Sequence, residues 1–92
     1  MMNRYERIRA ILGGAFRPTK LEIVDESAKH ASHAERNGVG GGETHYRIVM
    51  ISRDFAGQSR LARSRAVHAA LEPEFQTGLH ALSMILQTPE DV

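Results

Sequence analysis

The sequence contains no cysteine. This absence excludes disulfide bonds, catalysis by a thiol, and any metal site in which this chain alone supplies thiolate ligands. Histidine then remains as the only strong nitrogen ligand for a metal ion, since imidazole is a common metal ligand. The five histidines are His30, His33, His45, His68 and His80.

Long apolar runs are also missing from the sequence. No stretch approaches the roughly 20 apolar residues that a membrane-spanning helix needs, and the first residues do not show the pattern of a signal peptide. We therefore expect a soluble protein of the cytoplasm. We also expect one domain over residues 1–92, because a chain of this length buries only about 60–65% of its unfolded surface and cannot form two cores.

Basic and acidic residues are nearly balanced, since 12 basic and 11 acidic residues give a net charge of +1. The overall charge therefore gives no reason to expect nucleic-acid binding. One local cluster consists of Arg60, Arg63 and Arg65, with Arg53 close by. A solvated helix face is the simpler interpretation, and contact with phosphate or with an acidic partner is the alternative. No aromatic residues accompany these arginines, so stacking of single-stranded bases is not indicated.

The residue combinations that catalysis requires are absent as well. We find no nucleophile beside a base, no phosphate-binding loop and no suitably placed pair of carboxylates. We therefore expect that the protein is not an enzyme.

The clearest strand pattern in the sequence runs from Glu43 to Ser52. A period of two places Tyr46, Ile48 and Met50 on one apolar face and His45, Arg47, Val49 and Ile51 on a mixed face. Edge strands usually carry charges or proline, whereas this segment is apolar throughout one face and partly apolar on the other. We predict that it is the central strand of a small sheet.

The other elements are indicated by capping residues and by periodicity. A capping box of Asn3 and Glu6 predicts a first helix that ends before Gly13 and Gly14. Ser59 is the predicted cap of a later helix, and Pro73 is expected to begin a short one that Gly78 ends. The predicted segments are strands at 20–25 and 79–87, a loop at 28–42, and a helix from Arg60 to about Glu72. This order, α-β-β-α-α-β, defines an α/β (α+β) fold in which helices pack against a three-stranded mixed sheet.

The connections between the predicted strands fix their directions. A hairpin makes the first two strands antiparallel, and a helical crossover makes the last strand parallel to the central one. The end of the first strand then meets the starts of the other two at one end of the sheet. This arrangement would bring together the loop residues His30 and His33 with His45 and His80.

A metal site at that end of the sheet would be incomplete. Structural zinc requires four ligands and catalytic zinc usually three from the protein, so two imidazoles need a partner to complete the site. His80 with a loop histidine is the preferred ligand pair. We interpret His45 as a supporting residue hydrogen-bonded near Glu43, and His68 as a surface residue in the middle of a helix.

Four segments of the chain resemble the BolA family in their order and approximate spacing. They are LEIVDES at 21–27, ETHYRIV at 43–49, FAG at 55–57 and LHAL at 79–82. The resemblance covers nearly the whole chain, from Arg4 to Asp91, and implies a fold like that of class II K-homology domains. One departure lies in the second helix, where the family commonly has Arg-His-Arg and this chain has Arg63-Ser64-Arg65.

The resemblance implies a non-enzymatic partner of a monothiol glutaredoxin, acting in iron–sulfur cluster trafficking or in iron or redox sensing. The two proteins would share a [2Fe–2S] cluster, to which glutaredoxin and glutathione contribute sulfur and this chain contributes histidine. Two histidines replace two cysteines in Rieske-type clusters, which agrees with the missing cysteine. The family histidine falls on His80, and the second ligand falls on His30, with His33 as the alternative.

The resemblance also implies an alternative function for the chain. Bacterial members have a proposed role in transcription, cell morphology and the stress response, for which Arg60, Arg63 and Arg65 are the candidate nucleic-acid contacts. We expect the isolated chain to be a monomer or a weak homodimer and to hold no tightly bound cofactor.

Overall fold

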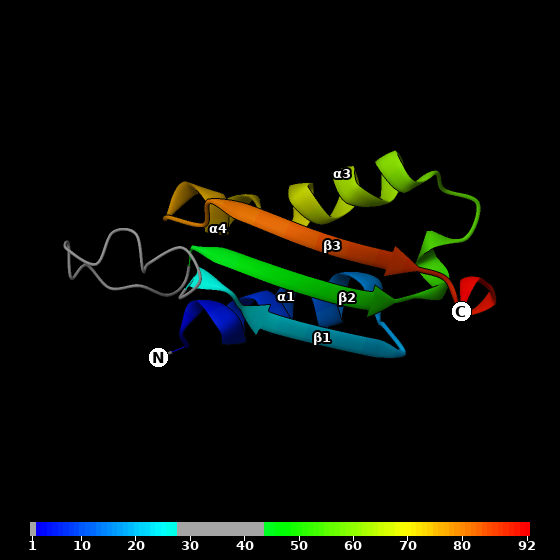
Figure 1. Cartoon of the computed structure of the whole chain (residues 1–92), viewed down its shortest axis with the longest axis horizontal. Coiled ribbons are helices and arrows are strands. Elements are labelled where there is room, and N and C mark those ends of the chain that lie inside the picture. The colour runs from blue at the N-terminus through cyan, green and yellow to red at the C-terminus, as the bar shows by residue number, and fades with distance from the viewer. Residues whose placement is uncertain (1, 28–43) are drawn as a thin grey trace.

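A computed structural model of the chain describes residues 2–27 and 44–92. The elements follow in the predicted order, which confirms the α+β class (Figure 1). They are α1 (Arg4–Phe16), β1 (Lys20–Asp25), β2 (His45–Ile51), the 3-10 turn η2 (Arg53–Phe55), α3 (Arg60–Ala70), α4 (Glu72–Gln76), β3 (Ala81–Gln87) and the 3-10 turn η3 (Pro89–Asp91).

The three strands form one mixed sheet in the order β1-β2-β3. β1 pairs with β2 in the antiparallel direction and β2 pairs with β3 in the parallel direction, so both predicted directions and the central position of β2 are confirmed. Asp25 lies opposite Tyr46, and His45 lies opposite Ala81. The end of β1 and the starts of β2 and β3 therefore meet at one end of the sheet.

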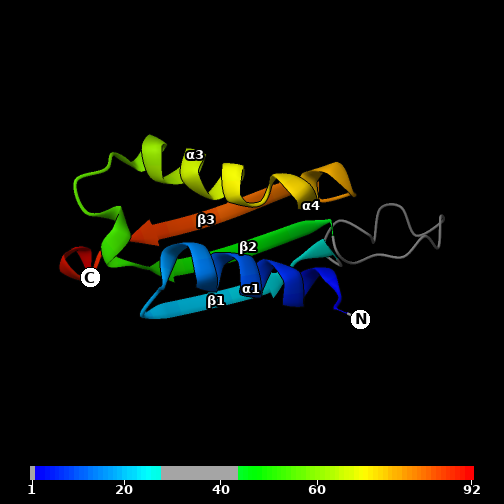
Figure 2. The same ribbon diagram turned by 180° about the vertical axis from the view of Figure 1, so that it is seen from behind.

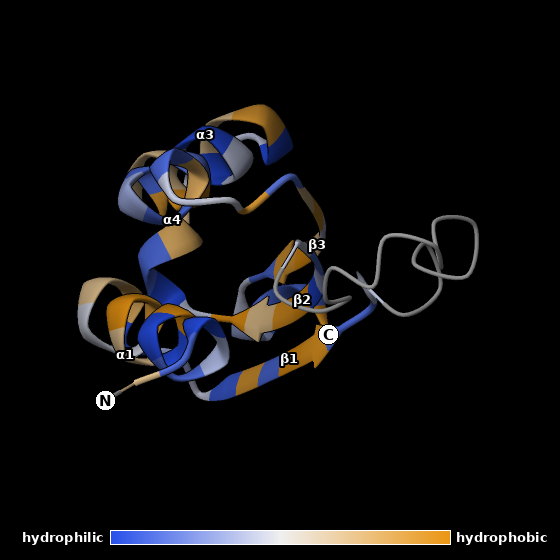
Figure 3. Cartoon of the chain, turned by 90° about the vertical axis from the view of Figure 1, so that its left-hand side faces the viewer, coloured by the Kyte–Doolittle hydropathy of each residue, from blue (hydrophilic) through white to orange (hydrophobic). Residues whose placement is uncertain are grey.

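The helices cover a single face of this sheet. Figures 2 and 3 show α1, α3 and α4 on the same side of the strands. Tyr46, Ile48 and Met50 point into this layer and are buried, as the period of two predicted, whereas the opposite face of β2 is only partly buried. The core is completed by Ile8, Leu12, Phe16, Ile23, Phe55, Val67, Leu71 and Leu79. Among the residues that the structure describes, no helix is long and apolar enough to cross a membrane.

The first helix begins as predicted but ends later. The Glu6 N–H donates to Asn3 Oδ1 (2.8 Å) and the Asn3 N–H donates to Glu6 Oε1 (2.9 Å), which forms the capping box. The predicted end before Gly13 is wrong, because the helix continues to Phe16. Each glycine destabilises a helix by about 1 kcal/mol relative to alanine. Burial of a phenylalanine side chain stabilises the folded state by roughly 1.5–3 kcal/mol. The Phe16 ring also packs on Phe55, with 5.3 Å between ring centroids.

Several further boundaries differ slightly from the prediction. α3 ends at Ala70 rather than near Glu72, which instead begins α4 with Pro73 as its second residue. β3 begins at Ala81 rather than at Leu79. The reason is that the Leu79 N–H donates to the Glu74 carbonyl (2.9 Å), so this residue closes the α4 turn and does not pair with β2.

A buried ion cluster joins α1 to the turn that precedes β3. Arg4 Nη1 donates to Glu74 Oε1 (2.8 Å), and Arg7 Nε donates to Glu74 Oε2 (2.9 Å). The hydrogen bond from Arg7 is the main cause that lowers the pKa of Glu74. Arg4 also reaches the turn itself, because its Nη2 donates to the Thr77 carbonyl (2.9 Å). The N-terminal helix therefore fixes the segment that leads to His80.

Candidate functional site

Backbone hydrogen bonds hold three chain segments together at one end of the sheet, which we call the histidine end. The Glu26 N–H donates to the His45 carbonyl (2.8 Å). The N–H groups of His80 and Ala81 both donate to the Thr44 carbonyl, at 2.8 and 3.1 Å. The end of β1 and the starts of β2 and β3 are therefore fixed relative to one another.

Two imidazole rings lie close together at the histidine end. The ring centroids of His45 and His80 are 6.0 Å apart, and the rings meet edge to face at 72°. His80 is exposed to solvent and His45 is partly buried. His45 Nδ1 lies 3.0 Å from the Thr44 hydroxyl, a contact that orients the ring. The two imidazole rings offer nitrogen atoms that could bind a metal ion, from the starts of two parallel strands.

The hydroxyl of Ser27 is a further polar group at the histidine end, and no sequence pattern indicated a role for it. Ser27 is buried, and its Oγ accepts hydrogen bonds from the N–H groups of Thr44 (2.9 Å) and His45 (3.0 Å). The Ser27 N–H donates to Asp25 Oδ1 (2.8 Å). An Asp side chain that accepts from the backbone N–H two residues on forms an Asx turn. Ser27 thus sets the backbone position from which His45 projects.

The turn before β3 determines where His80 is presented. Gly78 has a φ of +125°, a conformation that favours glycine, and a Cβ at this position would lie 3.0 Å from Arg4 Nη2. The following residue, Leu79, is buried in the core. His80 therefore follows a residue anchored in the core and a turn anchored by Arg4.

The structure brings together part of the predicted histidine cluster. His45 and His80 meet as the topology predicted, whereas His30 and His33 lie outside the described residues. Over residues 2–27 and 44–92 there is no group of three or more His, Cys, Asp or Glu side chains that could hold a metal ion. His68 is exposed, as predicted, and its ring stacks on Phe75 at 5.1 Å.

The three arginines of α3 are not equivalent. Arg60 and Arg65 are exposed, whereas the side chain of Arg63 is only 13% exposed. Arg63 Nη1 donates to the Leu86 carbonyl (3.0 Å) and to Asp91 Oδ2 (2.8 Å), and its Nε donates to the Gln58 carbonyl (3.0 Å). Arg63 therefore joins α3 to β3 and η3.

Asp91 is the acidic partner in this contact, and sequence reasoning missed it. Its Oδ2 also accepts a hydrogen bond from the Thr88 N–H (2.9 Å). This backbone bond, followed by the bond from Arg63, lowers the pKa of the Asp91 carboxyl. No sequence pattern pairs residues 28 positions apart, so periodicity could not have found the contact.

Comparison with known proteins gives consistent results for sequence and fold. Residues 12–91 match the family described as BolA-like protein. The UV-induced protein uvi31 of Schizosaccharomyces pombe is 40% identical, over 99% of this chain and 91% of the relative. The DNA-binding transcriptional regulator BolA of Escherichia coli is 39% identical, over 86% of this chain and 70% of the relative. The solved structure of BolA1 from Arabidopsis thaliana superposes with a TM-score of 0.89 at 38% identity, covering 100% of this chain and 98% of that one.

Proposed function

This chain belongs to the BolA family, and on that premise we propose that it is a non-enzymatic partner of a monothiol glutaredoxin, with which it co-binds a [2Fe–2S] cluster through histidine. The role that follows is iron–sulfur cluster trafficking, or iron or redox sensing, in the cytoplasm. The observation that carries the proposal is the meeting of His45 and His80 at 6.0 Å at the histidine end.

The donor set fits a shared cluster. Imidazole nitrogen is an established ligand of cluster iron in Rieske-type centres, and His80 offers one from an exposed position that a partner can reach. Because this chain has no cysteine, the thiolate ligands must come from glutaredoxin and glutathione. His80 is the first proposed ligand, His30 or His33 is the second, and His45 supports the site.

The proposal predicts that His80→Ala changes the visible absorption and circular dichroism of a cluster-loaded glutaredoxin mixed with this chain. The variant removes one proposed iron ligand, so we expect the spectral change seen with the unsubstituted chain to be lost and the mixed complex to dissociate more readily. His68→Ala is the matched control, because His68 is also exposed but lies on α3, where its ring stacks on Phe75.

Two outcomes of this experiment carry different meanings. If His80→Ala gives the same spectrum and complex stability as the unsubstituted chain, His80 is not a ligand. If the unsubstituted chain produces no spectral change with the glutaredoxin, the partnership itself is wrong. His30→Ala and His33→Ala in the same mixture then identify the second ligand.

A second candidate function is nucleic-acid binding in transcription, linked to the stress response and to cell morphology. The observation that favours it is the 39% identity to a relative named as a DNA-binding transcriptional regulator. Arg60 and Arg65 are exposed on α3 and suit phosphate contact, whereas Arg63 already binds Asp91 and the Leu86 carbonyl.

The salt dependence of duplex DNA binding tests this second function. Each lost phosphate contact is expected to make the negative slope of log K against log salt concentration less steep by about 0.9. Arg60→Gln and Arg65→Gln should therefore each reduce the magnitude of this slope by that amount. Arg9→Gln is the control, because Arg9 is exposed on α1. An absence of binding at low salt, measured by fluorescence anisotropy, would eliminate the function.

A further inference from the structure

The two outer strands of the sheet differ in charge. β1 carries Lys20, Glu22 and Asp25, whereas β3 reads ALSMILQ and contains neither a charge nor a proline. Charges and proline on edge strands discourage pairing with another chain. β3 therefore has no protecting charge or proline within the strand itself.

The hydrogen bonds of β3 show which of its backbone groups face outward. The Gln87 carbonyl accepts from the Ser52 N–H (2.9 Å), so it faces the β2 side, whereas the Leu86 carbonyl faces outward to Arg63. Backbone groups alternate in direction along a strand, so the N–H and C=O groups of Leu82 and Met84 also face outward. The described sheet has no strand beyond β3 on this side.

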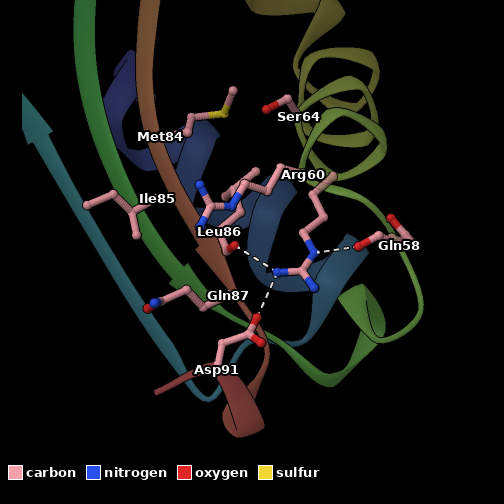
Figure 4. A pocket seen from close by; sticks show the side chains of 9 residues that line it. Gln58, Arg60, Ser64, Met84, Ile85, Leu86, Gln87 and Asp91 are labelled. Carbon is pink, nitrogen blue, oxygen red and sulfur yellow. Dashed lines mark hydrogen bonds and ion pairs between the residues drawn. The ribbon is translucent and has the colours of Figure 1, made fainter.

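A groove lies between this outer edge and α3. The cavity has a volume of about 550 Å³. Figure 4 shows Ser64 of α3 and Met84 of β3 pointing toward one another across it, with the Arg60 side chain extending from α3 toward β3. The groove thus combines an apolar wall with a row of outward backbone groups, which are the two features that bind an extended peptide as an added strand.

The charge of the groove favours an acidic ligand. Two arginines and one aspartate line it, and Arg63 is paired with Asp91. The exposed Arg60 has no ion pair among residues 2–27 and 44–92. α3 begins at Arg60, so the partial positive charge of the helix N-terminus adds to that of the guanidinium.

We propose that the outer edge of β3 and this groove bind an extended segment of a partner protein, which pairs with Met84 and with the Leu86 N–H as an added strand and places an acidic side chain at Arg60. A second copy of this chain fits less well, because pairing β3 with β3 brings no acidic residue of that strand to Arg60. The β3 residues that line the groove are residues 84–87, and Figure 1 shows that this end of β3 lies opposite the histidine end. This inference therefore goes beyond the proposed cluster-binding function.

Selection from a displayed library of random nine-residue peptides on the full chain tests the proposal. We expect the enriched peptides to combine β-branched residues with at least one Asp or Glu. For the tightest peptide, Arg60→Glu should weaken binding at least tenfold in fluorescence anisotropy, while Arg65→Glu changes it by less than twofold. Arg65 is the matched control because it is exposed on the same helix but does not line the groove.

Amide chemical shifts locate the bound peptide on the chain. The N–H signals of Met84 and Leu86 should shift on titration, and those of β1 should stay in place. The Arg60→Glu variant is expected to fold, since an acidic residue in the first turn suits the helix dipole. His80→Ala should leave peptide affinity unchanged, which separates this test from that of the cluster.

Three results would overturn the inference. The first is an absence of enriched peptides. The second is a mislocated peptide, shown either by equal affinity for the Arg60→Glu and Arg65→Glu variants or by amide shifts outside β3. The third is displacement of the peptide by single-stranded DNA that itself shifts the amides of β3 with higher affinity, because the groove would then belong to nucleic acid.

Discussion

Replacement of Glu74 by glutamine is expected to lower the free energy of unfolding by about 3–5 kcal/mol, the usual cost of leaving a buried charge without its partner. The Glu74 carboxylate is buried and binds both Arg4 and Arg7 of α1. Glutamine keeps the shape of the side chain but leaves the buried Arg4 guanidinium without its counter-charge. Urea unfolding followed by far-UV circular dichroism measures the change.

Glu72→Gln is the control for this substitution. Glu72 lies on the same short helix but is exposed, so its substitution should change the unfolding free energy by less than about 0.5 kcal/mol. A loss below 1 kcal/mol for Glu74→Gln would show that the carboxylate contributes little to the folded state.

The stabilisation by Glu74 should also depend on pH. The pKa of this carboxyl is lowered in the folded protein from its ordinary value of about 4.5. A lowered pKa stabilises the folded state above the unfolded pKa, and this stabilisation is lost as the pH falls through the folded value. The difference in unfolding free energy between the unsubstituted chain and Glu74→Gln should therefore be full at pH 7 and shrink below pH 4.5.

Phe55→Ala is expected to reduce the unfolding free energy by a similar amount, about 3–5 kcal/mol. The ring is fully buried and packs on Phe16, with 5.3 Å between centroids. The Arg63 guanidinium carbon lies 5.8 Å from the centroid of the same ring. Truncation leaves a cavity between the end of α1 and the turn that leads to α3, so packing is lost on both sides. Thermal and urea unfolding measure the effect.

Phe75→Ala provides the comparison for this variant. Phe75 is only partly buried and stacks on the exposed His68, so less apolar surface is lost and the cost should be clearly smaller. Equal losses for the two phenylalanine variants would contradict the central position assigned to Phe55.

The sheet was predictable from local patterns in the sequence. The period of two in 43–52 identified the buried residues Tyr46, Ile48 and Met50, and the helical crossover gave the parallel direction of β3. That topology also predicts that His45 and His80 lie at the same end of the sheet.

Contacts between distant residues account for what the sequence did not show. The glycines at 13 and 14 predicted a helix end, but burial of Phe16 against Phe55 extends the helix. In the sequence Arg63 belongs to a basic cluster with Arg60 and Arg65, yet its side chain binds Asp91 and the Leu86 carbonyl. Such pairings depend on the folded arrangement of the chain, and no local periodicity encodes them.

The parallel strand β3 carries the two proposed binding sites at its opposite ends. His80 precedes its first residue, and the groove lies along its last four residues. At about 3.3 Å per residue, the groove residues of β3 lie roughly 13–23 Å along the strand from His80. A glutaredoxin and a peptide-bearing protein could therefore occupy one chain together, and this small domain would hold two partners at a fixed spacing.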